Sequence, residues 1–572
     1  MNDFFLYGDF PRLVDMSEVI GIDTETTGLT WISKLLGISL AWTEADGNTK
    51  GCYFSSTPGL FADDVWPAEQ VTNFLLELFD SRLMVGHYSS FDARVLFRSF
   101  RAYPKRYYDT WHIVRSVEWS SSYSLSTLVS TKLKIKDSRW TEEKQQRANL
   151  EKLSHLQVSE YAIKDAKYCL MLFNEYYPRY QATGLEDTDI RFTNLTYQIM
   201  ERGFPINEPL LAQRIKTELK TFLEVQDRLQ KQGLNNPNSV HQVMRALKVR
   251  GIKAESTGAS DLEMFLDNPF VQDIVTFGQL NSNLYARLLV FQKYNDEGRL
   301  HAEWHPYGTV SYRMVAKDPN LMAQPLKDRD GRAYTPLAEI FVPEDKYILQ
   351  LDISQAEVRL AAMLSKSDDL ATVLASGEDP YMQMAKRAYG VANKETRTKA
   401  KRATLASIYE EGPRAFSEKH GVTYEEAFDI LDQFRQSYPH IKKMSNSYME
   451  YAKANGFINL FTGRKIFFSK SDERLYRAFN QEIQGGIAEL MREFMFRIEA
   501  RFPGAMIGQI HDSVVLEFPM KEMSRQFIEE VKTIAGREIK GCIPEKAYAL
   551  TTPTIPLLLD AEPFVRKIDA DF

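Results

Sequence analysis

Three strand-like apolar runs that carry acidic residues limit the fold of this chain more than any other feature. They are EVIGIDTETTG at 18–28, KYILQLDISQ at 346–355 and GQIHDSVVLEF at 508–518. The last consists of two short apolar runs with Asp512 at their junction. An acidic residue at the end of such a run is either part of a turn or a ligand of a metal ion. Helical patterns fill much of the sequence between these runs. This order predicts a multi-domain α/β enzyme with acids gathered near both ends of the chain.

The length of the chain, 572 residues, also requires more than one hydrophobic core, and we expect two to four domains. The break at QATGLEDTD, residues 181–189, predicts a linker between the first domain and the rest. A net charge of −6 does not by itself indicate nucleic-acid binding. It does not exclude it either, because acids in metal sites can mask a basic groove in the total.

The spacing of the cysteines and the composition of the N-terminus indicate where in the cell the protein acts. Cys52, Cys169 and Cys542 show no paired or CxxC spacing, which argues against a disulfide framework and against a zinc site. The sequence contains no apolar stretch long enough to span a bilayer, and its start lacks the features of a signal peptide. We therefore expect a cytoplasmic protein without membrane contact.

The N-terminal acids form a pattern that suits metal binding. Asp23 and Glu25 are two residues apart, so on a strand they share one face, and two like charges placed together call for a cation. Asp92 opens a helical pattern, and Tyr161 and Asp165 are four apart on another. Each feature alone fits a solvated or structural position better than a metal site. Their combination in one domain-sized segment favours a magnesium or manganese site.

Residues 20–175 resemble the DnaQ-like (DEDD-type) 3′–5′ exonucleases, in the branch with a tyrosine in the last motif. The resemblance implies an RNase H-like exonuclease domain over residues 1–185 that binds the 3′ end of single-stranded DNA. It also implies that two metal ions are held by Asp23, Glu25, Asp92 and Asp165, and that Tyr161 orients the attacking water. Tyr88 stands where this family usually has asparagine, at a contact to the primer terminus.

The second strand run leads into a helix with buried polar residues. Asp352 at its end fits a helix N-cap as well as a metal ligand. Gln355, Glu357 and Arg359 follow in an otherwise apolar segment, where burying such groups without partners costs several kcal/mol. A structural explanation for this segment must therefore supply those partners.

The segment KETRTKAKRATLASIYEEG, residues 394–412, places two cations, a leucine and an aromatic residue on one helical stripe. These residues are Arg397, Lys401, Leu405 and Tyr409, spaced four apart. Cations followed by an aromatic ring suit a triphosphate at one end and a base at the other. A solvated basic helix is the alternative, although Leu405 and Tyr409 extend the stripe beyond its charges.

Residues 295–560 resemble family A DNA polymerases. LDISQAEVRLAAML resembles motif A, RTKAKRATLASIYEEG motif B and QIHDSVVLEF motif C. The resemblance implies a right-hand polymerase after the exonuclease domain. Its parts are expected as thumb 190–295, first part of the palm 296–372, fingers 373–455 and second part of the palm 456–572.

The same resemblance implies roles for individual residues. Asp352 and Asp512 would hold two magnesium ions, with manganese as an alternative, and Lys401 would donate a proton to the leaving pyrophosphate. Glu357 resembles the residue that blocks a 2′-hydroxyl, which implies deoxynucleotide substrates. The expected dNTP-binding residues are Gln355, Glu357, Arg397, Lys401, Leu405 and Tyr409. The expected contacts to primer-template DNA are Arg313, Asn320, Arg464, Asn480, Gln484 and His511.

Two departures from the polymerase motifs concern activity. Leu405 stands where the family has phenylalanine or tyrosine, and Ser513 stands where motif C usually has glutamate. Glu517 cannot replace that glutamate, because four residues along a strand span about 13 Å. We expect Ser513 to weaken the hold on one metal ion without abolishing activity.

These features together predict a monomeric, template-directed DNA polymerase with a proofreading exonuclease. Because the chain starts directly at the exonuclease, its plan resembles phage or plasmid replicative polymerases. The main alternative is a 3′–5′ DNA exonuclease whose palm only holds DNA, which the departures in motifs B and C motivate. A purely structural DNA-binding protein would leave two sets of acids unexplained.

Overall fold

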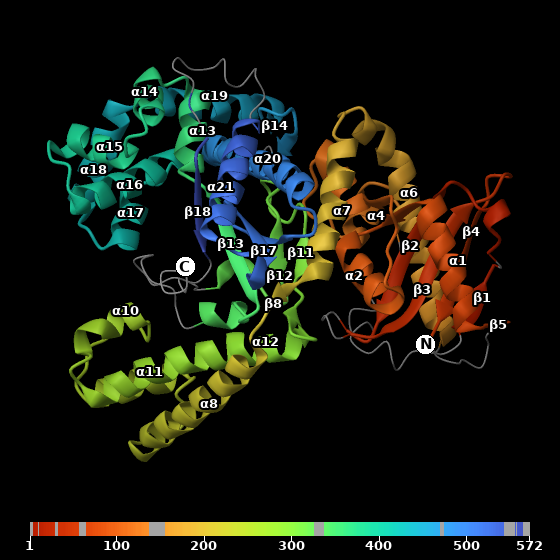
Figure 1. Cartoon of the computed structure of the whole chain (residues 1–572), viewed down its shortest axis with the longest axis horizontal. Helices are drawn as coiled ribbons and strands as arrows, with labels where there is room; N and C mark the ends of the chain where they lie inside the picture. Colours follow the sequence, from red (N-terminus) through yellow and green to blue (C-terminus); the bar gives the residue numbers. More distant parts are fainter. Residues whose placement is uncertain are drawn as a thin grey trace.

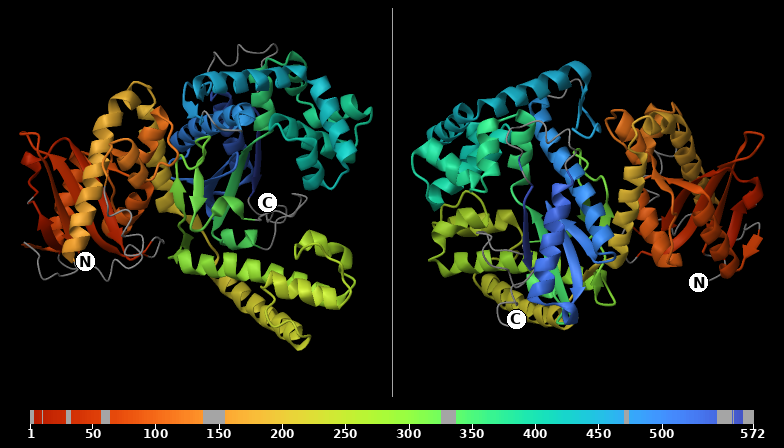
Figure 2. Two further views of the ribbon diagram at one scale, coloured as in Figure 1. Left: turned by 180° about the vertical axis from the view of Figure 1, so that it is seen from behind. Right: turned by 45° about the horizontal axis from the view of Figure 1, so that its top comes forward.

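The computed structural model describes residues 4–9, 11–28, 33–56, 64–136, 155–324, 337–469, 474–542, 555 and 557–563. A sheet domain from the first part of the chain lies at one end of the molecule (Figure 1). A central part built on strands β13 and β17 follows it. Two helical parts project from the centre on the side away from the N-terminal domain, as the rear view also shows (Figure 2).

The N-terminal domain is a seven-stranded mixed sheet in the order β5-β1-β4-β3-β2-β6-β7. Its central strand β2 pairs antiparallel with β3 and parallel with β6. The strand-like run at 18–28 is confirmed as β2. The strands are β1 Phe4–Gly8, β2 Val19–Thr26, β3 Leu35–Thr43, β4 Thr49–Ser55, β5 Asp64–Trp66, β6 Leu83–Gly86 and β7 Tyr107–Asp109.

A long helix, α6, packs across β2, β3 and β4 and covers one face of this sheet. Its approach to β2 is close because Gly21 has no side chain: a Cβ atom there would lie 2.2 Å from the carbonyl oxygen of Ala166. This contact brings the acids of β2 toward those of α6. The described helices of the domain are α1 Ala68–Ser81, α2 Ser89–Phe100, α3 Thr110–Val117, α4 Leu125–Thr131 and α6 His155–Gln181.

The predicted linker is short, because α6 ends at Gln181 and α7 (Glu186–Arg202) begins five residues later. Helix α7 lies within the range expected for the thumb, but it packs on α2 of the N-terminal domain and on β11 and β16 of the centre. It therefore joins the two parts and does not extend into the helical arm.

The helical arm has a hydrophobic core of its own, which includes Phe222, Leu229, Phe270 and Phe277. Its two longest helices, α8 and α11, pack against each other. The helices are α8 Glu208–Lys231, α9 Val240–Val249, α10 Ala259–Leu262, α11 Pro269–Asn283 and α12 Leu289–Tyr294, with a π-helical segment at Leu284–Leu288.

The centre is an antiparallel sheet in the order β16-β17-β13-β18. Its register places Asp352 of β13 opposite Ser513 of β17 on one side and Asp560 of β18 on the other. The predicted buried strand at 346–355 is confirmed as β13, and residues 508–518 are a hairpin. The principal elements are β13 Lys346–Ile353, α13 Ala356–Ser365, α20 Ala478–Arg501, β16 Met506–Ile510, β17 Ser513–Pro519, α21 Arg525–Lys540 and β18 Leu559–Pro563.

Short strands connect the arm to the centre, and a helical part lies opposite the arm. The short strands are β8 Phe204–Pro205, β9 Asn295–Asp296, β10 Arg299–Leu300, β11 Glu303–His305 and β12 Val315–Lys317. The second helical part and the hairpin after it are α14 Asp368–Ala375, α15 Pro380–Tyr389, α16 Lys394–Ile408, α17 Pro413–His420, α18 Tyr424–Ser437, α19 Pro439–Asn455, β14 Phe457–Asn459 and β15 Lys465–Phe467. In the part of the chain that the structure describes, no helix combines the length and apolarity that crossing a bilayer requires.

Candidate active sites

The N-terminal acids gather between β2, α2 and α6. Asp23 and Glu25 lie on β2, Asp92 in the first turn of α2, and Tyr161 and Asp165 on α6. Burial, together with the nearby charges of three of these acids, raises the pKa of the Cys169 thiol well above its usual range. Asp23, Asp92 and Asp165 therefore lie within electrostatic range of one residue of α6.

Asp92 is held in place by β2. Its Oδ1 atom accepts hydrogen bonds from the backbone N–H of Thr24 at 3.0 Å and from the Thr24 hydroxyl at 2.5 Å. Burial still raises the pKa of Asp92 to about 7, and the charge of Asp109 adds to the increase. A carboxylate in this position gains from a nearby cation, because a positive charge favours its ionised form. The acids therefore fit a divalent cation.

Tyr88 connects this centre to the rest of the molecule. It precedes α2 with a left-handed backbone (φ 63°), its hydroxyl lies 3.1 Å from Lys317 Nζ, and its ring lies 4.1 Å from that of His305. Lys317 and His305 belong to β12 and β11. Tyr88, which stands where the exonuclease family usually has asparagine, thus contacts Lys317 and His305 of the centre.

The acids of the central sheet come from neighbouring segments. Asp352 ends β13, Asp512 lies in the turn between β16 and β17, and the N–H of Ile353 donates to the carbonyl of Asp512 at 3.0 Å. The Asp512 side chain is 24% exposed and lies 3.6 Å from the guanidinium of Arg313. Burial raises the pKa of Asp512, and Arg313 partly offsets this. The two acids predicted to act together are therefore adjacent.

Ser513 occupies the position beside these acids. Its hydroxyl lies 2.9 Å from Asp352 Oδ1 and 2.8 Å from the carbonyl oxygen of Ile510, and it accepts a hydrogen bond from Gln350 Nε2 at 2.7 Å. The side chain is buried, at 1% exposure. Ser513 therefore fixes the orientation of Asp352 directly, a contact that the sequence did not reveal.

Two further carboxylates near the central sheet have contacts that matter for the site. Glu517 forms ion pairs with Arg299 and Lys346, so it is engaged at the other end of β17. Asp560 lies opposite Asp352 on β18 and accepts a hydrogen bond from Ser354. Sequence reasoning missed Asp560, because the register between β13 and β18 is not visible in either segment alone.

A polar cluster joins the helices around Asp352. Tyr409 donates a hydrogen bond to Glu357, and Gln484 Nε2 lies 2.9 Å from Glu357 Oε1 and 2.7 Å from the Tyr409 hydroxyl. Arg313 approaches Glu357 to 4.0 Å. Residues predicted on three separate motifs are thus in contact. The partners that Arg359 required are the carbonyls of Ser354 and Leu374 and the side chain of Gln355.

The predicted stripe on residues 394–412 is helix α16, which Tyr409 follows directly. Arg397 and Lys401 both lie over the ring of Tyr381 on α15, at 5.6 and 5.9 Å, and Arg397 pairs with Asp379 at 2.6 Å. Leu405 is partly exposed on the same helix. The stripe keeps one face, as its spacing predicts.

The remaining residues predicted to bind DNA or dNTP differ in exposure and in whether their polar atoms already have hydrogen-bond partners. Asn320 accepts hydrogen bonds from the backbone of residues 322 and 323, whereas the buried Oδ1 of Asn480 has no hydrogen-bond partner among the described residues. His511 is exposed, and Gln355 begins α13 with φ 55°.

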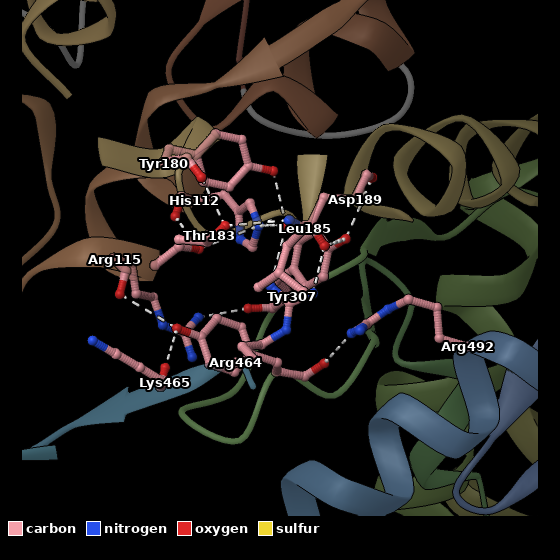
Figure 3. A network of polar contacts seen from close by, with 12 residues as sticks. His112, Arg115, Tyr180, Thr183, Leu185, Asp189, Tyr307, Arg464, Lys465 and Arg492 are labelled. Atoms are coloured by element: carbon pink, nitrogen blue, oxygen red, sulfur yellow. Dashed lines mark hydrogen bonds and ion pairs between the residues drawn. The ribbon is translucent and has the colours of Figure 1, made fainter. Parts of the chain in front are cut away.

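The prediction that Arg464 contacts DNA is wrong. Its side chain is 0% exposed and lies 2.5 Å from Asp189 Oδ1 and 2.6 Å from Glu489 Oε1. Figure 3 shows this network, which also includes His112 and Tyr307. Burial opposes ionisation of Asp189, but Arg464 and His112 hold its pKa well below the usual range. Arg464 therefore fastens the linker helix α7 to the centre.

The acids of both centres are the candidates for metal binding. Within the ranges that the structure describes, no three His, Cys, Asp or Glu side chains are already grouped closely enough to hold an ion. The donors are nevertheless carboxylate oxygens, which suit magnesium and manganese. Burial raises the pKa of Asp92 and of Asp512, and a bound cation would favour the ionised form of both.

Comparisons with known proteins agree with this arrangement. The sequence model described as DNA polymerase family A matches residues 210–550, and the one described as 3′-5′ exonuclease matches residues 7–178. DNA polymerase I of Borreliella burgdorferi is 24% identical over 95% of this chain and 62% of that protein. The thermostable DNA polymerase I of Thermus thermophilus is 29% identical over 50% of this chain and 36% of that protein. The chain thus spans less than two thirds of the length of these relatives.

A solved structure shares the fold. It is the POL domain of Pol1 from M. smegmatis in complex with DNA primer-template and dNTP. The TM-score is 0.72 at 17% identity, and the match covers 95% of this chain and 94% of that one. The predicted fold class, an exonuclease domain followed by a right-hand polymerase, is confirmed.

Proposed function

This chain belongs to DNA polymerase family A, and on that premise we propose that it extends primers with deoxynucleotides and trims their 3′ ends. The observation that carries the proposal is the meeting of Asp352 and Asp512 beside the Glu357, Tyr409 and Gln484 cluster. It supplies carboxylates for metal ions next to side chains that can bind a nucleotide.

In the polymerase centre, Asp352 and Asp512 would hold two magnesium or manganese ions. Such ions lower the pKa of the primer 3′-hydroxyl and neutralise the triphosphate when they are bound. Arg397 exchanges its pairing with Asp379 for the phosphates, and Lys401 binds beside it and donates a proton to pyrophosphate. Because both cations extend from one face of α16, they reach the same group.

The sugar and base meet the other end of the same helix. Leu405 offers an apolar surface and Tyr409 an aromatic one, and Gln355 completes the set. Glu357, held by Tyr409 and Gln484, excludes a 2′-hydroxyl because its carboxylate is fixed on two sides. Contacts to primer-template DNA come from Arg313, Asn320, Asn480, Gln484 and His511. Minor-groove contacts of this kind read pair geometry and not sequence.

In the exonuclease centre, Asp23, Glu25, Asp92 and Asp165 would hold the two ions. Tyr161 orients a water for attack on the last phosphodiester bond of a single strand. The hydrogen bonds from Thr24 keep Asp92 facing the other acids. Removal of a mispaired terminal nucleotide here would correct errors made at Asp352. A role in phage or plasmid replication stays a prediction.

Primer extension tests the proposal. Native protein, Asp352→Asn and Asp23→Ala are each incubated with a labelled primer-template, magnesium and four dNTPs. We expect native protein to lengthen the primer, Asp352→Asn only to shorten it, and Asp23→Ala to lengthen it without degrading single strands. If native protein only shortens the primer, the polymerase proposal fails. If Asp23→Ala still degrades single strands, the exonuclease assignment fails.

A second candidate function is a 3′–5′ exonuclease whose central sheet holds DNA without catalysis. The observation that favours it is Ser513, which places a hydroxyl where the family has a third carboxylate. Failure of native protein to extend primers, with intact excision, is the result that would support it.

A further inference from the structure

The loop that joins β6 to α2 contains a strained residue beside the exonuclease centre. Tyr88 directly precedes α2 and has left-handed backbone angles (φ 63°, ψ 46°), which are unfavourable for a bulky side chain. Its side chain makes no hydrogen bond that caps the helix. A contact from outside α2 is therefore needed to hold the first turn, in which the candidate metal ligand Asp92 lies.

Asp109, at the end of β7, makes that contact. Its Oδ1 atom accepts a hydrogen bond from the backbone N–H of Tyr88 at 2.8 Å, and its Oδ2 atom accepts one from the N–H of Ser89 at 3.1 Å. Oδ1 also accepts from the N–H of Trp111 at 2.9 Å, so that Asp109 caps α3 as well. One carboxylate thus holds the starts of two helices, where backbone N–H groups have no partner within the helix.

The next residue fastens the same loop. The Thr110 hydroxyl donates to the carbonyl oxygen of Gly86 at 3.1 Å and lies 2.8 Å from Nδ1 of His87. Strands β6 and β7 are parallel and place Gly86 opposite Asp109, so the loop leaves β6 beside these two residues. The end of β7 therefore determines where α2 begins.

Asp92 is thus located from two sides. Thr24 of β2 holds its carboxylate, and Asp109 holds the backbone at the start of its helix. Tyr88 and Asp92 are four residues apart, about 6 Å along a helix, so a shift of the first turn moves the Asp92 carboxylate with it. Groups that orient a metal ligand without touching the metal affect affinity strongly, and removing one commonly weakens binding by about 10–100-fold.

Asp109 also brings a negative charge close to Asp92, whose pKa it helps to raise. Charge and position are therefore two ways in which Asp109 can act on a bound cation. The contacts distinguish them, because the N–H groups of Tyr88 and Trp111 both donate to Oδ1. An asparagine at residue 109 keeps an acceptor for these two groups and loses the charge.

We propose that Asp109 is a positioning residue of the exonuclease centre, which holds the first turn of α2 so that the Asp92 carboxylate faces the metal ions. The proposal rests on the proposed function for the identity of that centre. The role follows from Tyr88, because the asparagine that is usual in the exonuclease family tolerates a left-handed backbone and can cap a helix by itself.

Binding of Mn²⁺ by the full chain without DNA tests the proposal, with electron paramagnetic resonance measuring the free ion. All variants carry Asp512→Asn to reduce binding at the polymerase centre, and Asp165→Asn added to it defines the contribution of the exonuclease centre. Asp109→Ser keeps a cap for α3, but its hydroxyl lies too close to the backbone to reach α2. We expect Asp109→Ser to raise the Mn²⁺ Kd of the exonuclease centre about tenfold.

Three further variants separate position from charge and from stability. Asp109→Asn is expected to bind Mn²⁺ more nearly as native protein does than Asp109→Ser, because it keeps Oδ1. Tyr88→Asn added to Asp109→Ser is expected to restore most of the lost affinity, because it removes the strain and supplies a cap. Ser524→Ala removes the cap of α21 in the centre, and we expect no change in Mn²⁺ binding.

Excision kinetics provide a second readout. Asp109→Ser is expected to lower kcat for single-stranded DNA and to leave both KM and primer extension near their native values. Circular dichroism identifies a variant that does not fold. If Asp109→Ser does not fold, Asp109→Glu replaces it, since Asp109→Glu keeps the charge and moves the oxygens by one methylene group, and the same loss of Mn²⁺ affinity is expected.

The proposal is overturned if Asp109→Ser binds Mn²⁺ as native protein does, or if native protein shows no binding that depends on Asp165. It is also overturned if Asp109→Asn loses as much affinity as Asp109→Ser, if Tyr88→Asn restores none of it, or if Ser524→Ala loses as much. Because the binding assay contains neither DNA nor dNTP, a failure of native protein to excise nucleotides would contradict the proposed function and leave this result standing.

Discussion

In the N-terminal centre Asp92 is 3% exposed and accepts two hydrogen bonds from Thr24, whereas in the polymerase centre Asp512 is 24% exposed and faces Arg313. The first centre collects its acids from a strand and two helices, and the second from one strand and the adjacent hairpin. In the first centre, packing therefore brings the carboxylates together, and a bound cation would offset the repulsion between them. The second already holds a guanidinium and the hydroxyl of Ser513 beside its acids.

The largest expected effect separates the two centres. Asp512→Asn is predicted to lower the rate of primer extension about a thousandfold, because it removes several kcal/mol of metal-mediated charge stabilisation. Excision of single strands by the same variant stays near the native rate. Asp165→Asn is the matched change in the other centre. It is expected to lower the rate of excision and to leave primer extension near the native rate. Rapid-quench measurements of both reactions on both variants provide the check, and parallel loss of the two activities would mean that the centres are not separate.

The network around Arg464 tests whether the two centres share one rigid frame. Arg464→Met removes the cation that Asp189 and Glu489 share, although His112 stays beside Asp189 and Arg492 beside Glu489. We expect the free energy of unfolding to fall by about 3–5 kcal/mol. Urea denaturation measures the change, with the exposed neighbour Lys465→Met as the control. A variant as stable as native protein would show that this network does not fasten α7 to the centre.

The pH dependence of stability is predicted to differ between the centres. The folded-state pKa of Asp92 is raised to about 7, so metal-free protein is stabilised by this group at low pH and loses that stability as the pH rises toward 7. Between pH 5 and 8 the loss amounts to about 2–4 kcal/mol. Asp92→Asn removes this dependence, whereas Asp512→Asn changes it less because Arg313 offsets the burial of Asp512. Thermal melts in EDTA across this range compare the two, and equal slopes would contradict the contrast.

The smallest expected effect concerns Ser513. Ser513→Glu supplies the third carboxylate that the polymerase family usually has, and we expect the magnesium concentration for half-maximal extension to fall about tenfold. Ser513→Ala, which removes the hydrogen bond to Asp352, is expected to raise it. Glu517→Gln serves as the control, since Glu517 is paired with Arg299 away from the acids. An unchanged magnesium requirement in Ser513→Glu would mean that this position does not affect the ions.

Local spacing in the sequence predicted strands β2 and β13 and helix α16. Asp23 and Glu25 on one strand, and the stripe on α16, follow from the periods of strands and helices. Contacts that depend on strand register or on packing between domains were not predictable in this way. Asp560 is adjacent to Asp352 only through β18, and Arg464 meets Asp189 only because α7 packs on the centre.

The contacts of Tyr88 were also not predictable from local spacing. The sequence marks it as a departure from the exonuclease pattern, but its partners, Lys317 and His305, lie more than two hundred residues away. A single chain contains no local signal for such a contact. The sequence therefore revealed the exonuclease motif, but not the residues that Tyr88 contacts.

The central claim is that Asp352 and Asp512 support nucleotide addition with serine in place of the third acid. The most direct measurement is addition of one templated nucleotide by Asp23→Ala protein, in which excision cannot hide extension, over a range of magnesium concentrations. We predict that the primer grows by one nucleotide only when the complementary dNTP is present. The double variant that carries both Asp23→Ala and Asp352→Asn is predicted not to extend the primer. Absence of growth at every magnesium concentration, with the DNA still bound, would contradict the claim.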